Sequence, residues 1–215
     1  MPRRSPISTP TWTFAHFTKP PLSAVRGLVF ALGALPAAAL VARLITANLG
    51  VNPVETLPHG TGIWALRCLL ISLAITPLRW LTGLNGLVRL RRQIGLWAFF
   101  YAISNFSIFA VFEHSLVIAT MLNDVAERPY ILVGTAALML LIPLALTSTT
   151  GWIRRLGRNW KRLHWSVYPA GVLGLVHFFW LIKADRWVEP LAYALILAGL
   201  LGVRLWRRWP ARSAP

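Results

Sequence analysis

The chain of 215 residues is 56% hydrophobic and only 13% charged, yet it carries a formal net charge of +16. So few charged residues cannot cover a solvated globular surface, which excludes a soluble nucleic-acid-binding domain despite the excess of basic residues. The single cysteine, Cys68, excludes an intramolecular disulfide and any iron–sulfur or zinc site built from several cysteines. The sequence also has no nucleotide-binding loop, dinucleotide fingerprint or nucleophile elbow, so soluble chemistry must come from a partner or from the membrane.

The apolar residues gather in six blocks, each close to the roughly 20 residues that cross a hydrocarbon core of about 30 Å. The sequence therefore predicts an all-α polytopic membrane bundle of six transmembrane helices, which occupies residues 21–206. In chain order the predicted spans are Pro21–Ala47, Gly62–Trp80, Ile94–Phe112, Tyr130–Thr147, Ser166–Ala184 and Pro190–Trp206.

Two short segments lie outside this bundle. Residues 1–20 hold four prolines and several Ser and Thr without an apolar core of signal-peptide type. We predict that they form a flexible cytoplasmic tail rather than a cleaved leader. Residues 207–215 are predicted to be a basic cytoplasmic tail.

Acidic and basic residues alternate between successive connections. All the acidic residues fall in three alternate connections, whereas most of the 22 Lys and Arg fall in the complementary segments, including a basic group predicted to follow the sixth span. By the positive-inside rule, both termini are then cytoplasmic. The acidic residues are Glu55, Glu113, Asp124, Glu127, Asp185 and Glu189, and the last basic group is Arg204, Arg207, Arg208 and Arg212.

Two histidines lie at the predicted outer ends of the second and third spans. His59 falls in a polar turn, Leu57–Gly62, that we expect directly before a helix, and His114 follows the third span. We interpret both as interfacial side chains; the alternative is that either lies near a redox centre on the outer face.

Two further histidines share the fifth span, His164 at its cytoplasmic mouth and His177 near its middle. Thirteen residues separate their Cα atoms by about 20 Å and turn them roughly 140° apart, so the two are not expected to ligate one iron together. An ionisable group within a span is costly and marks a pathway or a cofactor, unless a bond between helices satisfies it. Both interpretations of His177 stay open on the residues alone.

The third and fifth spans run in the same direction, and Asn105 and His177 each lie 11 residues beyond the inner end of their span. Both therefore lie about 17 Å from the inner end of their helix. In a four-helix arrangement that encloses a porphyrin edge-on, two axial ligands would face each other at such positions. Asparagine is a poor haem ligand, however, and the alternative is a buried amide that bonds across helices.

A basic and aromatic cluster is predicted at the inner ends of the third and fifth spans. It could attract a quinone headgroup, a flavin phosphate or an anionic lipid, although positive-inside charge alone would also explain it. The cluster comprises Arg89, Arg91, Arg92, Trp160 and Lys161.

Four motifs, at residues 91–99, 128–130, 146–149 and 156–168, carry a family resemblance. An arginine pair opens one span (RRQIGLWAF), and a Leu-Gly approach to a histidine opens another (LGRNWKRLHWSVY). These motifs, and about residues 26–206 as a whole, resemble the MsrQ (YedZ) family within the ferric-reductase-like transmembrane superfamily.

This resemblance implies an electron conduit in a bacterial inner membrane, with haem b and flavin mononucleotide (FMN) as cofactors. Electrons would come from the quinone pool or a cytoplasmic flavin reductase. They would pass to MsrP, a periplasmic molybdopterin enzyme that reduces oxidised methionine in proteins. The lipid bilayer is then a further partner, and nucleic acid is not.

The resemblance also implies site residues. His164 and His177 match the family's two histidines on the fifth span, and His59 matches one at the start of the second. Asn105 stands where the family's haem histidine of the third span is expected. Three outcomes follow: a five-coordinate haem on His177, a substitute sixth ligand, or a haem held differently or lost.

Two other function classes stay open. In the first, the chain is a non-catalytic membrane anchor for the periplasmic reductase, with a haem site that has degenerated at Asn105. In the second, it is a small transporter with His177 as a proton relay, although no clear inverted repeat is present.

Overall fold

The computed structural model describes residues 22–50, 53–182 and 187–208, and in these ranges it is all-α without a strand. Three short helices and three single turns join the long helices. The long helices are α1 (Leu22–Ile45), α2 (Pro53–Thr82), α3 (Val88–Ile108), α5 (Pro129–Leu146), α8 (Val167–Leu181) and α9 (Val188–Arg208). The short elements are η1 (Asn85–Leu87), η2 (Phe109–Glu113), α4 (Ile118–Glu127), α6 (Thr150–Leu156), α7 (Arg158–Leu163) and η3 (His164–Ser166).

Five of the long helices, all except α8, are long and apolar enough to cross a membrane. The predicted all-α fold is thereby confirmed, with five helices in the described part of the chain that could cross a membrane. Helix α8 corresponds to the fifth predicted span but has 15 residues, about 22 Å at the usual rise per residue. The last two residues of that predicted span, and the predicted tail at residues 1–20, lie outside the described residues. Six crossings and cytoplasmic termini therefore stay predictions.

The predicted start of the second span was wrong. Helix α2 begins at Pro53, so His59 lies inside a helix and not in a polar turn before one. The glycines that suggested a turn serve helix packing instead. A Cβ on Gly60 would lie 3.0 Å from a Leu40 methyl group of α1, and one on Gly62 would lie 3.2 Å from the Asn105 amide of α3. Small residues at these positions let three helices approach closely.

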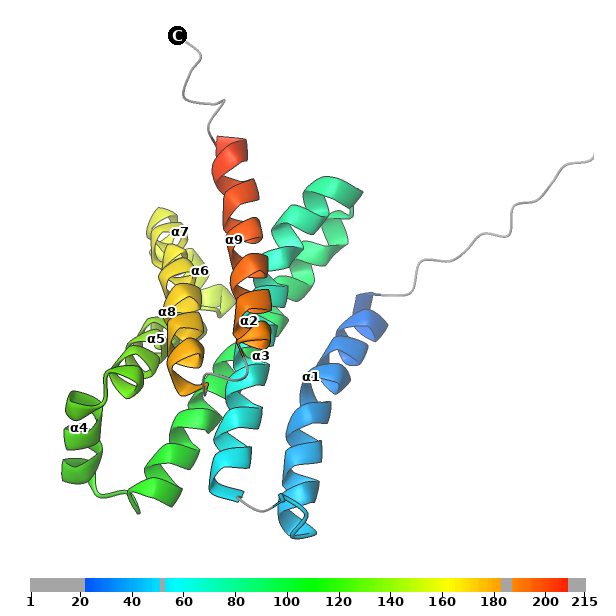
Figure 1. The fold of residues 1–215 in the computed structure, drawn as a ribbon. Coiled ribbons are helices and arrows are strands. Elements are labelled where there is room, and N and C mark those ends of the chain that lie inside the picture. The colour runs from blue at the N-terminus through cyan, green and yellow to red at the C-terminus, as the bar shows by residue number, and fades with distance from the viewer. Residues whose placement is uncertain (1–21, 51–52, 183–186, 209–215) are drawn as a thin grey trace, which may run out of the picture.

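The core lies where α2 and α8 meet their neighbours. Helix α2 pairs most extensively with α3, and α5 pairs with α8. Leu73 and Tyr101 are almost completely buried between them. By contrast, α1 stands at the edge of the bundle, and Pro36 is its only buried residue among those described (Figure 1). Many Leu, Phe and Trp side chains are exposed on the outer surface of the bundle, as expected for a surface solvated by lipid.

The Tyr101 hydroxyl of α3 is inserted into the backbone of α1 next to Pro36. It accepts the Ala37 N–H at 3.0 Å and donates to the Gly33 carbonyl at 2.6 Å. In a regular helix that N–H would bond this carbonyl directly, and here the hydroxyl bridges the two groups. Buried backbone groups are thus satisfied across two helices.

The prediction that Arg204 follows the sixth span was also wrong. Arg204 lies within α9 and is buried, and its guanidinium donates to the Leu73 carbonyl of α2 and lies 5.4 Å from the centre of the Tyr168 ring. In a regular helix the Leu73 carbonyl would accept the N–H of residue 77, which is a proline without one. Arg204 therefore ties α9 to α2 by satisfying a carbonyl that a proline leaves open.

The start of α1 and the end of α9 lie at the same end of the bundle, and α4 lies at the opposite end (Figure 1). Helices α6 and α7, which carry the basic connection before α8, lie at the first of these ends. The bundle thus has one end near η3 and His164 and another near α4.

Candidate functional site

His177 of α8 is half-buried against α5 and has a single polar partner among the described residues. Its Nδ1 lies 2.6 Å from the backbone carbonyl of Tyr130. Because a carbonyl only accepts hydrogen bonds, Nδ1 carries the hydrogen of a neutral imidazole and Nε2 keeps its lone pair. A backbone carbonyl that fixes the ring in this way is the usual support for a histidine that ligates a metal through Nε2.

Gly134 gives the His177 ring its place on α5. A Cβ at this position would lie 2.7 Å from Nδ1 and 2.8 Å from Cε1 of the imidazole. No side chain fits there without displacing the ring, so Gly134 is a positioning residue for His177.

His164 in η3 is held in a similar way. Its Nδ1 lies 3.1 Å from the Trp160 carbonyl, and its ring stacks on the Trp160 indole with the centroids 3.8 Å apart. The Nδ1 hydrogen is again donated to a carbonyl, which leaves the Nε2 lone pair available. The His164 side chain lies outside the membrane-spanning segments. Burial lowers its pKa, the bond to the Trp160 carbonyl opposes this, and the positive charge of Arg91 lowers it further.

Asn105 of α3 makes its hydrogen bonds to α2. Its amide nitrogen donates to the Pro58 carbonyl at 2.6 Å and to the Thr61 hydroxyl at 3.2 Å, so both amide hydrogens have acceptors. The partners of Asn105 and His177 thus lie on different helices. This is the interpretation of Asn105 as a buried amide that bonds across helices.

His59 is exposed on α2, and its ring stacks 6.4 Å from that of Phe178, the residue after His177. The helix pairing thus brings His59 next to α8, at a residue that points about 100° away from the candidate ligand. His59 has no hydrogen bond to another described residue that would fix its tautomer.

At the end of the bundle near His164, the structure brings part of the predicted basic and aromatic cluster together. Trp160 anchors the connection, because its indole N–H donates to the Thr147 carbonyl at 3.0 Å. Arg91 is half-buried close enough to His164 to affect its pKa. Arg89, Arg92 and Lys161 are exposed.

A groove of about 570 Å³ runs between α1 and the α2–α3 pair. Its lining is almost wholly apolar, and it holds none of the predicted site residues. Its walls include Leu32, Pro36, Leu40, Trp64, Ile71 and Trp97.

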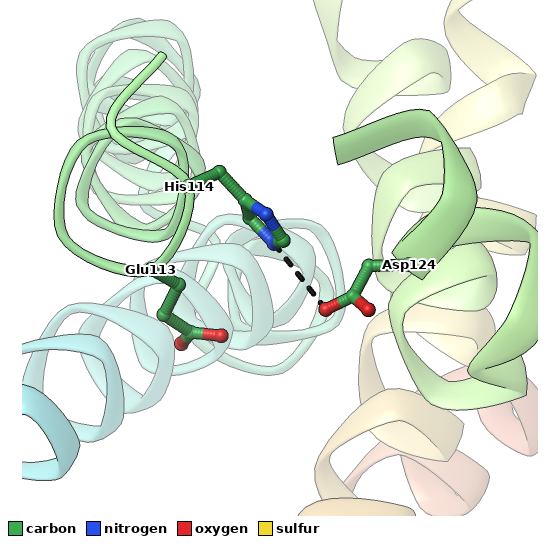
Figure 2. Close-up of side chains that lie close together, drawn as sticks. All are labelled: Glu113, His114 and Asp124. Atoms are coloured by element: carbon green, nitrogen blue, oxygen red, sulfur yellow. Dashed lines mark ion pairs between the residues drawn. The ribbon is translucent and has the colours of Figure 1, made fainter. Parts of the chain in front are cut away.

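Sequence reasoning missed one group of polar side chains. Glu113, His114 and Asp124 converge where the C-terminal end of α3 meets α4, and their ligating atoms all lie within 4.8 Å of one another (Figure 2). The adjacent Glu-His pair was a signal, but its partner lies ten residues further on, on a helix that was not predicted.

Comparison with known proteins agrees with this architecture. The family described as ferric reductase like transmembrane component matches residues 61–175. A protein of Xanthomonas axonopodis pv. citri, named protein-methionine-sulfoxide reductase heme-binding subunit MsrQ, is 52% identical over 165 residues, which are 77% of this chain and 75% of the relative. A protein of Herminiimonas arsenicoxydans with the same name is 43% identical over 201 residues, 92% of each chain.

The chain belongs to the MsrQ family. The resemblance that the sequence motifs suggested is therefore confirmed, and MsrQ is a membrane family related to ferric reductases. No solved structure matches the chain. The matched region includes His164, which lies on η3. His177 lies two residues beyond the end of the matched region.

Proposed function

We propose that this chain is the haem b-binding electron-transfer subunit of a methionine-sulfoxide reductase system. It would carry electrons across the bacterial inner membrane from the quinone pool or a cytoplasmic flavin reductase to a periplasmic molybdopterin reductase, MsrP. The names of its relatives, heme-binding subunits of protein-methionine-sulfoxide reductase, support the class of function.

The observation that carries the proposal is the His177 imidazole. It lies on a helix inside the bundle, its tautomer is fixed by the Tyr130 carbonyl, and its Nε2 has no partner among the described residues. A neutral imidazole with an available Nε2 is the donor that haem iron takes as an axial ligand. The residues present therefore fit a haem group.

When bound, haem supplies a one-electron iron couple inside the membrane, where a bare ion would be prohibitively costly. The chain's own residues position the ligand for it. Tyr130 holds the His177 hydrogen on Nδ1, and Gly134 leaves room for the ring. The hydrogen bond that Nδ1–H donates to a carbonyl raises the basicity of Nε2 as a ligand.

The inner mouth is our candidate for the entry of electrons. His164 offers a second neutral Nε2, and Arg91 beside it, with the exposed Arg89, Arg92 and Lys161, provides positive charge for a quinone headgroup or the phosphate of FMN. We assign His164 to a second haem or to coupling with the donor.

Asn105 is then not expected to ligate iron, because an amide is a poor haem ligand and two hydrogen bonds hold this amide against α2. This favours a haem on His177 alone, or one with a sixth ligand from elsewhere, such as His59 on the flank of α8.

We also propose six crossings with both termini in the cytoplasm. The start of α1 and the end of α9 lie at the same end of the bundle (Figure 1), as an even number of crossings requires. The basic connections also lie toward that end.

A reduced-minus-oxidised absorption spectrum of the detergent-purified protein, with a pyridine haemochrome count per chain, tests the proposal. We expect a b-type spectrum in the wild type and loss of most haem in His177→Ala. Replacing His164 by Ala should leave the His177 haem in place and remove a second haem or slow reduction by the donor. The His114→Gln variant serves as the histidine control, since that side chain lies at the outer end of α3.

Two results would contradict the proposal. Wild-type haem content in His177→Ala would remove its role as a ligand. A wild-type protein without haem that still co-purifies with the periplasmic reductase would instead support the membrane-anchor function.

A further inference from the structure

The cluster of Glu113, His114 and Asp124 lies at the end of the bundle opposite His164 and is not used by the proposed electron path. Glu113 ends the π-turn η2, His114 follows it, and Asp124 comes from the middle of α4 (Figure 2). Single π-turns within helices are frequent at functional sites. The cluster therefore joins the end of α3 to α4, through a side chain ten residues after His114.

The side chain of His114 is nearly enclosed, with 9% of its surface exposed. The Phe109 ring packs against it edge-on, with the centroids 4.6 Å apart. Its Nε2 is buried and has no hydrogen-bond partner among the described residues, although Asp124 Oδ2 lies 3.3 Å away. A buried nitrogen in that state is costly unless something else occupies the space in front of it.

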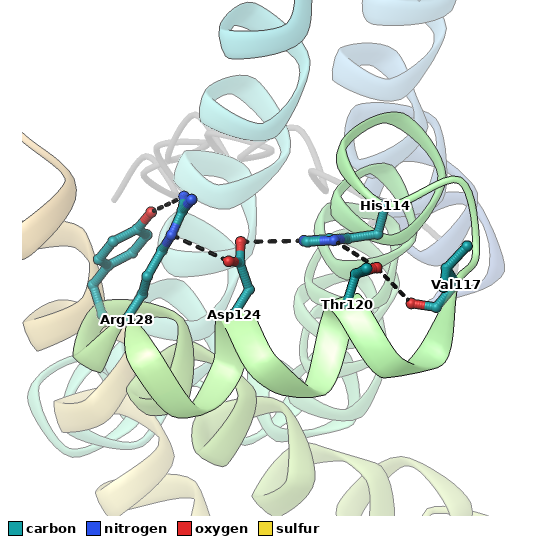
Figure 3. Close-up of polar contacts among 6 residues, drawn as sticks. His114, Val117, Thr120, Asp124 and Arg128 are labelled. Atoms are coloured by element: carbon teal, nitrogen blue, oxygen red, sulfur yellow. Dashed lines mark hydrogen bonds and ion pairs between the residues drawn. The ribbon is translucent and has the colours of Figure 1, made fainter.

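The other ring nitrogen fixes the tautomer (Figure 3). The Thr120 hydroxyl donates its only hydrogen to the Val117 carbonyl at 2.8 Å, so it can only accept from His114 Nδ1, which lies 3.2 Å away. Nδ1 therefore carries a hydrogen, and Nε2 faces a carboxylate oxygen. Two such atoms at this distance require a cation between them, which is either a second ring proton or a metal ion bound by the Nε2 lone pair.

Asp124 is oriented to supply one side of such a site. Its Oδ1 faces Arg128 Nε at 3.4 Å, which leaves Oδ2 for the side of His114. Outer partners of this kind, Thr120 for the imidazole and Arg128 for the carboxylate, are what hold metal ligands in position.

We propose that Glu113, His114 and Asp124 bind a divalent transition-metal ion, with zinc as the best fit. For zinc bonds of about 2.0 Å in a tetrahedral site, neighbouring ligand atoms lie about 3.3 Å apart. The distance from His114 Nε2 to Asp124 Oδ2 is 3.3 Å. The exposed Glu113 side chain is free to supply the third ligand, and water the fourth. The ion would fasten α4 to the end of α3.

Zinc binding to the full-length protein tests this proposal. The protein would be purified in detergent with a tag that lacks histidine, stripped with a chelator and titrated with zinc against a chromogenic competitor. We expect one zinc per chain that is lost in His114→Gln and in Asp124→Asn. The matched control is Glu127→Gln, because Glu127 is an exposed carboxylate on the same helix and has no place in the cluster.

A milder variant separates metal binding from folding. Thr120→Val keeps all three ligands but removes the acceptor for Nδ1, and we expect it to weaken zinc binding by about tenfold or more. X-ray absorption at the zinc edge should show one histidine nitrogen and oxygen ligands at about 2.0 Å.

Two outcomes would overturn the proposal. Either the wild-type protein binds no zinc, so that a second proton on His114 stands between the two acceptors, or His114→Gln and Asp124→Asn bind zinc as the wild type does. The haem content of His114→Gln is expected to equal that of the wild type, so this test is independent of the proposed electron-transfer function.

Discussion

The helix pairs α2–α3 and α5–α8 each hold a polar side chain between two helices, Asn105 in the first pair and His177 in the second. Asn105 donates both amide hydrogens to α2, to a carbonyl and a hydroxyl. His177 donates one hydrogen to α5 and keeps a lone pair without a partner in the described part of the chain. Both amide hydrogens of Asn105 serve to join α3 to α2, whereas the His177 ring is positioned by one hydrogen bond and its Nε2 is left able to bind. The bonds that a buried polar group does not make are therefore the better guide to function.

The largest effect on haem binding is expected from Gly134→Ala, which tests this contrast at His177. The added methyl group would lie 2.7 Å from His177 Nδ1, closer than real contacts allow, so the ring must leave its place on the Tyr130 carbonyl. We expect haem binding to fall by about tenfold to a hundredfold, as when partners that orient metal ligands are lost. The haemochrome count per chain measures this.

The control for that variant is Gly199→Ala in α9, where an added Cβ meets nothing within 4 Å. It adds the same methyl group to a transmembrane helix without touching His177. Equal haem contents in the two variants would show that the contact between Gly134 and the imidazole does not matter.

A smaller effect of the opposite kind is expected from Asn105→Ala. The change removes two hydrogen bonds between α3 and α2, each worth about 0.6 kcal/mol in a membrane protein, so stability should fall by about 1 kcal/mol. Haem content should stay unchanged, because Asn105 is not a ligand in our proposal. Thermal unfolding in detergent and the haemochrome count together test this. If Asn105→Ala lost haem as His177→Ala does, the contrast between the two helix pairs would fail.

The sequence predicted the long helices well because length, hydropathy and charge decide them locally. Helix α5 begins and ends within one residue of its predicted bounds. Its first residue is a proline that follows a charged residue, and a polar turn follows its last residue. The start of α2 was misjudged because glycine is equally suited to a turn and to close helix packing, and only the tertiary contacts of Gly60 and Gly62 decide between them.

The candidate site was predictable only in part. His164 and His177 were found because ionisable groups near or within spans are rare, but their supports are backbone carbonyls, which leave no mark in a sequence. The same holds for Arg204, whose partner is the carbonyl that Pro77 leaves open. The cluster around His114 depends on the fold of a connection, which no periodic pattern predicted.

The smallest effect concerns the pH dependence of stability at His164, which has Arg91 as a charged neighbour. Burial is the main cause of the lowered pKa of His164, and the charge of Arg91 adds to it. The folded protein therefore resists protonation more than the unfolded chain does. The resulting stability is present above the ordinary histidine pKa of about 6.5 and is lost as pH falls through the lower pKa of the folded state.

In Arg91→Gln the pKa of His164 should rise toward its ordinary value, and the loss of thermal stability between pH 7 and pH 5 should become shallower. Arg92→Gln, which removes an exposed charge next to it, serves as the control. An identical pH dependence in the wild type and both variants would mean that Arg91 does not act on His164, and that burial alone keeps this imidazole neutral and able to bind iron.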